Sequence, residues 1–75
     1  MSDEFHPSIV AILQYFHYMH LPERLQEISK PCCELATIMA STLNQNPELT
    51  MGLRKLLEAK DCFVRAGLDE HRNEV

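Results

Sequence analysis

Two consecutive stretches of the chain carry apolar side chains at the spacing of an amphipathic α-helix, and this periodicity constrains the fold most strongly. In residues 22–43 and 47–66, apolar residues recur every three or four positions, which places them on one face of each helix. The polar stretch between them offers Asn46 as a helix cap and Pro47 as a first helical residue. A short turn between two such helices predicts an antiparallel hairpin.

A shorter apolar segment precedes the hairpin. It begins at Pro7 and reaches Phe16, and His6 or Ser8 is placed to cap it. It must end before Pro22, because the residue that precedes a proline is disfavoured in the helical region. The chain shows no run of alternating apolar and polar residues that would indicate a strand. The sequence therefore predicts an all-α fold, a short N-terminal helix followed by a two-helix hairpin.

Three local signals refine this picture. Pro31 lies inside the first long helix, where it removes a backbone hydrogen bond and predicts a kink. Gly67 is predicted to cap the C-terminus of the last helix, with Arg65 in its final turn. Residues 1–6 and 69–75 are expected to fray. A single domain of 75 residues buries a thin core, so we expect a homo-oligomer.

Charge and cysteine content narrow the class of protein. The net charge of −4 argues against binding to a DNA or RNA polymer, which requires a basic surface. Three cysteines, with Cys32 and Cys33 adjacent, form no disulfide framework and favour a reducing compartment. The N-terminus lacks the cationic start of a signal peptide, and the apolar run 9–19 is too short to cross a bilayer. We expect a soluble cytoplasmic protein.

Signatures of catalysis and of metal binding are missing. The chain has no glycine-rich phosphate loop, no GxSxG and no HExxH, so it is predicted not to be an enzyme and to need no cofactor. His17, His20, Cys32 and Cys33 are the residue types that bind zinc. Adjacent cysteines do not form a chelating pair, however, and Cys32 belongs to the core face. We therefore predict no metal site.

Charged residues of the second long helix are candidates for binding an anion. Lys60 falls within the apolar face, where it either buries its stem and extends its charge to water or holds an anion in a pocket. Arg54, Glu58, Asp61 and Arg65 form a stripe at steps of three and four residues. That stripe is either a solvated ion-pair face or a source of arginine forks for phosphate.

Aromatic and imidazole rings cluster ahead of the first long helix. Tyr15, Phe16, His17, Tyr18 and His20 fall within six positions. They form either an apolar plug at the open end of the hairpin or a platform for a nucleobase, on which each stack contributes about 1–3 kcal/mol.

Residues 16–68 carry a recognisable pattern. It reads F-x-Y-x-H-L-P-x-x-L-Q-x-x-S from Phe16, then E-L-A, a polar turn, and L-R-K-L-L-E-A-K-D-x-x-x-R-A from Leu53. This pattern resembles the phage helical-hairpin family that includes the anti-CBASS and anti-Thoeris sponge proteins. The chain departs from that family at Met19, where a tyrosine is usual, and Lys30 is its nearest match to an expected lysine.

The resemblance implies a function. Such proteins sequester cyclic oligonucleotides or cyclic ADP-ribose isomers in the host cytosol, without hydrolysis, in pockets between the protomers of an oligomer that is commonly a hexamer. Rings near the His-x-Pro motif stack on bases, and basic side chains hold phosphates. On this basis the predicted ligand-binding residues are Tyr18, His20, Lys30, Arg54, Lys55, Lys60 and Arg65. The alternatives are a helical protein–protein interaction module, or an inhibitor of a host protein, and a small metal-bound regulator.

Overall fold

The computed structural model describes the backbone of residues 5–72 and the side chains of residues 5–68. Within residues 5–72 the chain forms helices and no strand, which confirms the all-α prediction. In chain order the elements are α1 (Pro7–Leu13), a 3₁₀ turn η1 (Gln14–Phe16), α2 (Glu23–Thr42) and α3 (Pro47–Arg72).

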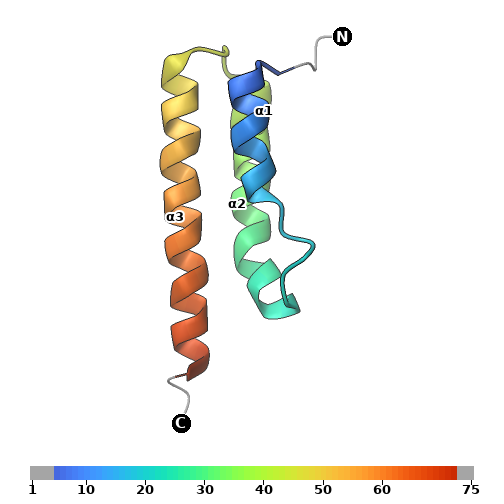
Figure 1. The fold of residues 1–75 in the computed structure, drawn as a ribbon, viewed down its shortest axis with the longest axis vertical. Coiled ribbons are helices and arrows are strands. Elements are labelled where there is room, and N and C mark those ends of the chain that lie inside the picture. Colours follow the sequence, from blue (N-terminus) through green and yellow to red (C-terminus); the bar gives the residue numbers. More distant parts are fainter. Residues whose placement is uncertain (1–4, 73–75) are drawn as a thin grey trace.

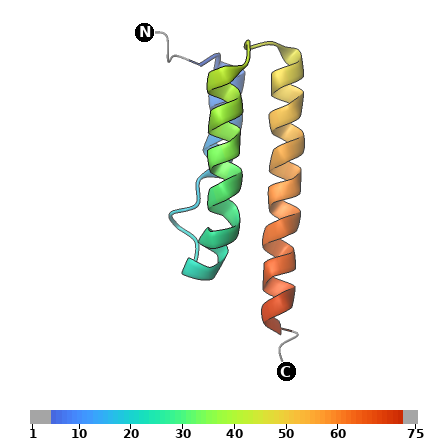
Figure 2. The ribbon, with the colours of Figure 1, turned by 180° about the vertical axis from the view of Figure 1, so that it is seen from behind.

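The two long helices α2 and α3 lie side by side and antiparallel, joined by a short loop (Figure 1). Helix α1 packs against one face of this pair and covers α2 in that view. Seen from behind, α2 and α3 have no third element in front of them (Figure 2). The molecule is elongated, with principal extents of 50 × 21 × 17 Å. One face of the hairpin is therefore covered and the other is bare.

Local side chains fix where the helices begin. The Nδ1 atom of His6 accepts a hydrogen bond from the backbone N–H of Ser8 at 3.1 Å, so His6 caps α1. The Oδ1 atom of Asn46 accepts from the N–H of Leu49 at 3.0 Å, which is the predicted cap of α3. The backbone N–H of His6 also donates to Oε1 of Gln45. The start of α1 is thereby tied to the loop between α2 and α3.

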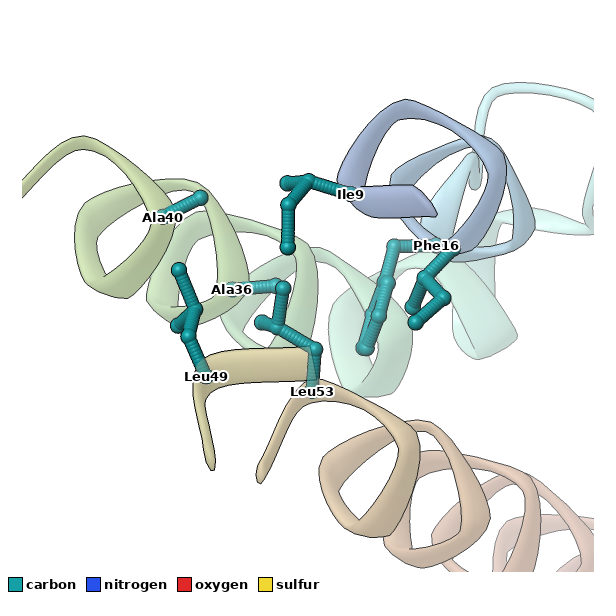
Figure 3. Packing of buried hydrophobic residues seen from close by; sticks show 7 residues of the cluster. Ile9, Phe16, Ala36, Ala40, Leu49 and Leu53 are labelled. Atoms are coloured by element: carbon teal, nitrogen blue, oxygen red, sulfur yellow. The ribbon is translucent and has the colours of Figure 1, made fainter. Parts of the chain in front are cut away.

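The core lies between α1, η1 and the two long helices (Figure 3). Helix α2 contributes only small side chains to it, whereas α1, η1 and α3 contribute large ones. Phe16 is completely buried, and it is the largest of these side chains. Because alanine lets the helices approach closely, the large residues of α1 and α3 meet over the surface of α2. The buried apolar residues are Ile9, Ile12, Phe16, Ala36, Ala40, Leu49 and Leu53.

Helix α2 continues through Pro31 rather than ending there. Figures 1 and 2 show its first turn set off from the axis of the remainder, on the N-terminal side of the proline, as a missing backbone hydrogen bond would allow. Two residues earlier, Ser29 is fully buried and its hydroxyl has no hydrogen-bond partner. A buried hydroxyl without a partner costs stability.

Gly67 does not cap the last helix, so that prediction is wrong. Helix α3 runs on to Arg72, and no glycine among the described residues has a positive φ. Gly67 is instead buried against α2, and a Cβ atom there would collide with the side chain of Ile28. The glycine permits close approach of two helices rather than a turn. Of the residues expected to fray, 69–72 continue α3 as helix, and residues 1–4 and 73–75 lie outside the described residues.

Replacing Phe16 with alanine should lower the free energy of unfolding by about 3–5 kcal/mol, because the change opens a cavity under α1. Tyr15→Ala is the matched control, since the neighbouring ring is 63% exposed and its loss should cost less than about 1 kcal/mol. Urea denaturation followed by circular dichroism measures both. Equal losses for the two variants would contradict the packing described for α1.

Ser29→Ala should have the opposite effect on stability and raise the free energy of unfolding by about 1 kcal/mol. The substitution removes a buried hydroxyl that lacks a partner and introduces a better helix former. Ser41→Ala, at an exposed position of the same helix, gains helix propensity alone. A gain at Ser29 no larger than the gain at Ser41, in the same denaturation experiment, would show that the Ser29 hydroxyl is satisfied in solution.

Candidate functional site

A shallow pocket of about 260 Å³ lies toward the open end of the hairpin, away from the loop between α2 and α3. One wall comes from η1 and the loop that follows it, and the other from α3. The chain brings these segments together because Phe16, which ends η1, is anchored in the core. The lining residues are Tyr15, His17, His20, Leu21, Lys60, Asp61, Val64 and Arg65.

Two imidazole rings form the loop side of this pocket. His17 and His20 stack with their ring centroids 5.6 Å apart and their planes 8° from parallel. The loop that carries them is held from α2, because Nε2 of Gln26 donates to the carbonyl of Leu21 at 2.8 Å and to that of Met19 at 3.4 Å. Hydrogen bonds therefore hold the backbone of this loop, and both rings are exposed.

Lys60 supplies the deepest charge of the pocket. Its side chain is only 12% exposed, and Nζ pairs with the Asp61 carboxylate at 2.9 Å. The buried stem agrees with the first interpretation of Lys60 given by the sequence, and the ammonium lines the pocket. An anion that enters the pocket would meet an ammonium that is already paired with the Asp61 carboxylate.

Arg65 supplies the second cation, from an exposed position one turn beyond Asp61. Its Nη2 atom donates to the Sγ of Cys62 at 3.3 Å, which turns the guanidinium along the helix surface. With neutral histidines, the lining carries two cations and one carboxylate. The pocket is therefore positive in a chain whose net charge is −4. A ligand with phosphate groups and flat rings fits this combination of cations and imidazoles.

The predicted site residues fall into two groups. His20, Lys60 and Arg65 lie together in the pocket. The other four are outside its lining: Tyr18 is half-buried in the loop, whereas Lys30, Arg54 and Lys55 are exposed elsewhere on the long helices, as the burial of each shows.

The pocket also contains residues that the sequence argument did not select for the site. Tyr15 and His17 belonged to the ring cluster, and Asp61 to the charged stripe, so a signal existed for each. Which members of the cluster and the stripe face one another depends on the register between η1 and α3. That register is a long-range property of the fold.

The pKa of the Cys32 thiol depends on the charge of the Lys60 ammonium. Burial raises the pKa of Cys32, the charge of Lys60 opposes that rise, and the neighbouring Cys33 adds to it. The Sγ of Cys32 lies 3.6 Å from the carbonyl of Ile28, within α2. Lys60 on α3 is thus close enough to affect a thiol on the facing helix, which agrees with its low exposure.

The described part of the chain lacks two other kinds of feature. Across it, no group of three or more His, Cys, Asp or Glu residues is arranged to hold a metal ion. Its helices also lack the combination of length and hydropathy that a bilayer crossing would require. Comparison with known proteins adds nothing to this geometry, because no family model, curated protein or solved structure matches the chain.

Alkylation of the cysteines tests the surroundings of Lys60. We expect iodoacetamide to modify exposed Cys62 first and Cys32 more slowly, because burial shields Cys32 and its raised pKa leaves less thiolate. Lys60→Gln should slow Cys32 further, since a charge that favours the thiolate is removed. Peptide mass spectrometry of a Cys33→Ser background follows each site. No change at Cys32 in the Lys60→Gln variant would place the ammonium elsewhere.

Proposed function

We propose that this protein is a non-enzymatic sponge for cyclic nucleotide signals, which it binds in the pocket of rings and cations and holds without hydrolysis. The observation that carries the proposal is the convergence of the stacked His17–His20 pair with Lys60 and Arg65. Flat rings stack on bases, and an arginine fork and an ammonium bind phosphate. In this proposal the protein is encoded by a phage and acts in the cytosol of the infected cell, as the resemblance implies.

The size of the pocket supports assembly of several chains. Pockets for small molecules commonly measure about 300–1,000 Å³ and enclose most of the ligand. The pocket of one chain is about 260 Å³ and open. A nucleotide of two or three bases would project beyond it, so a second protomer would have to supply the missing wall. We therefore include a homo-oligomer in the proposal, with the α2–α3 hairpin as its repeating unit.

The arrangement of the imidazoles supports capture rather than hydrolysis. In-line displacement at phosphorus needs groups that stabilise the attacking and the leaving oxygens on opposite sides. His17 and His20 are stacked and parallel, so they present their rings from one side of the pocket. The carboxylate that lines the pocket, Asp61, is engaged by Lys60 at 2.9 Å. This geometry suits stacking and charge neutralisation.

A thermal-shift panel tests the proposal directly. Cyclic di- and trinucleotides and cyclic ADP-ribose isomers are compared with linear mononucleotides, because a ligand that binds only the folded form raises the midpoint by mass action. We expect one cyclic class to raise the midpoint and its linear analogue to leave it unchanged. Chromatography of ligand released by heat should recover it intact. A flat panel on folded protein, or recovery of a linear product, would refute the sponge.

Arg65→Ala should weaken binding of the cyclic ligand roughly tenfold or more, the loss typical of one charge-assisted hydrogen bond. Arg54→Ala is the matched control, because the same residue type lies on the same helix outside the pocket. Isothermal titration calorimetry gives both affinities, and circular dichroism checks that helicity is retained. A loss at Arg54 with none at Arg65 would move the phosphate site away from this pocket.

A second candidate function is a helical protein–protein interaction module. The observation in its favour is an apolar groove on the bare face of the hairpin, lined by residues of α2 and α3. The melting temperature of such a protein would not change with any nucleotide of the thermal-shift panel. The two functions therefore give different outcomes in the same experiment.

A further inference from the structure

His17 and His20 give the pocket two side chains of the type whose charge changes between about pH 5 and 8. Their rings stack with centroids 5.6 Å apart, and both side chains are exposed, so a proton from water can reach them. Within residues 5–68, no hydrogen bond or ion pair engages a nitrogen of either ring. The ring nitrogens are therefore available both to a ligand and to a proton.

The charged groups that share the pocket with these rings come from α3. They are the ammonium of Lys60, the guanidinium of Arg65 and the Asp61 carboxylate, which Lys60 engages at 2.9 Å. Helix α2 contributes no lining residue, and it holds the loop of the rings through Gln26, which carries no charge. Because the one lining carboxylate is already paired, a proton on the imidazoles would need an anion from solution as its partner.

Protonation changes what the rings offer to an anion. A neutral imidazole has one N–H donor and one nitrogen that accepts hydrogen bonds, whereas an imidazolium has two N–H donors and a positive charge. The charged oxygens of a phosphodiester only accept, so they favour the imidazolium. Two imidazolium rings with centroids 5.6 Å apart would repel each other. The pair should therefore take up one proton with an anion rather than two.

We propose that the His17–His20 pair takes up one proton together with a phosphate-type anion, so that the pocket holds its ligand more tightly as the pH falls. The bound anion stabilises the imidazolium and raises the pH at which the pair loses its proton. Affinity is therefore highest at about pH 6 and declines as the pH rises towards 8. The inference rests on the proposed function for the identity of the ligand, but the proton step itself requires only an oxyanion.

Sulfate is a suitable probe, because it has the tetrahedral oxygens of a phosphate group and keeps one charge over this range of pH. The Cε1–H protons of the histidines are followed by NMR as the pH changes, in sodium sulfate and in sodium chloride of equal ionic strength. Sulfate should raise the titration midpoint of the His17–His20 pair. It should leave His6 unchanged, because that ring lies outside the pocket and caps α1. Equal midpoints in the two salts, or an equal rise at His6, would overturn the proposal.

A double variant tests which rings carry the proton. In the unmodified chain the dissociation constant for sulfate should rise with pH and approach about tenfold per pH unit, the limit for one proton. In His17→Gln/His20→Gln it should not change with pH, because the titrating groups are gone. His6→Asn is the matched control, since asparagine also caps a helix, and it should keep the full dependence on pH. A dependence that survives in the double variant would place the proton elsewhere and overturn the proposal.

The proton step and the sponge can fail separately. A cyclic nucleotide that binds with the same dissociation constant at about pH 6 and about pH 8 would overturn the proton step and leave the sponge standing. A flat nucleotide panel together with sulfate binding that depends on the imidazoles would refute the sponge and leave a proton-linked anion site.

Discussion

The packing of α1 across the hairpin is the contact on which the rest of the structure depends. Two helices alone bury one narrow seam, and the only fully buried apolar side chains of α2 among the described residues are those of Ala36 and Ala40. The missing volume is supplied from outside the hairpin, chiefly by the side chain of Phe16. Because the loop with the stacked histidines follows Phe16 directly, the residue that completes the core also sets the position of the pocket.

Features that depend only on contacts between residues a few positions apart could be predicted from the sequence. His6 and Asn46 cap their helices through hydrogen bonds to residues two and three positions away, so their side-chain chemistry suffices. Gly67 shows where this reasoning fails. A glycine near the end of an apolar pattern looks the same whether it caps the helix or faces a neighbouring one. Only the position of Ile28, thirty-nine residues earlier, separates the two cases.

The residue types that form the candidate site could be predicted from the sequence, but the way in which the fold brings them together could not. Arg54 and Arg65 belong to one stripe, yet eleven residues of helix separate them by about 16 Å, too far for both to line a pocket of about 260 Å³. His20 and Lys60 come from opposite ends of the sequence and meet only because η1 packs toward α3. Helical periodicity places residues on a face, but it cannot say which part of that face a distant segment will reach.

The pocket and the groove make different demands on an assembly. The pocket is lined by η1, its following loop and α3, and the groove by α2, α3 and the loop between them, on the face away from α1. They share no lining residue, so a copy docked on the groove would leave the pocket open to a ligand. It would also leave the pocket without its outer wall. A single heterologous interface, in which the pocket side of one chain docks on the groove of the next, would cover both surfaces, whereas two-fold contacts alone would need one interface for each.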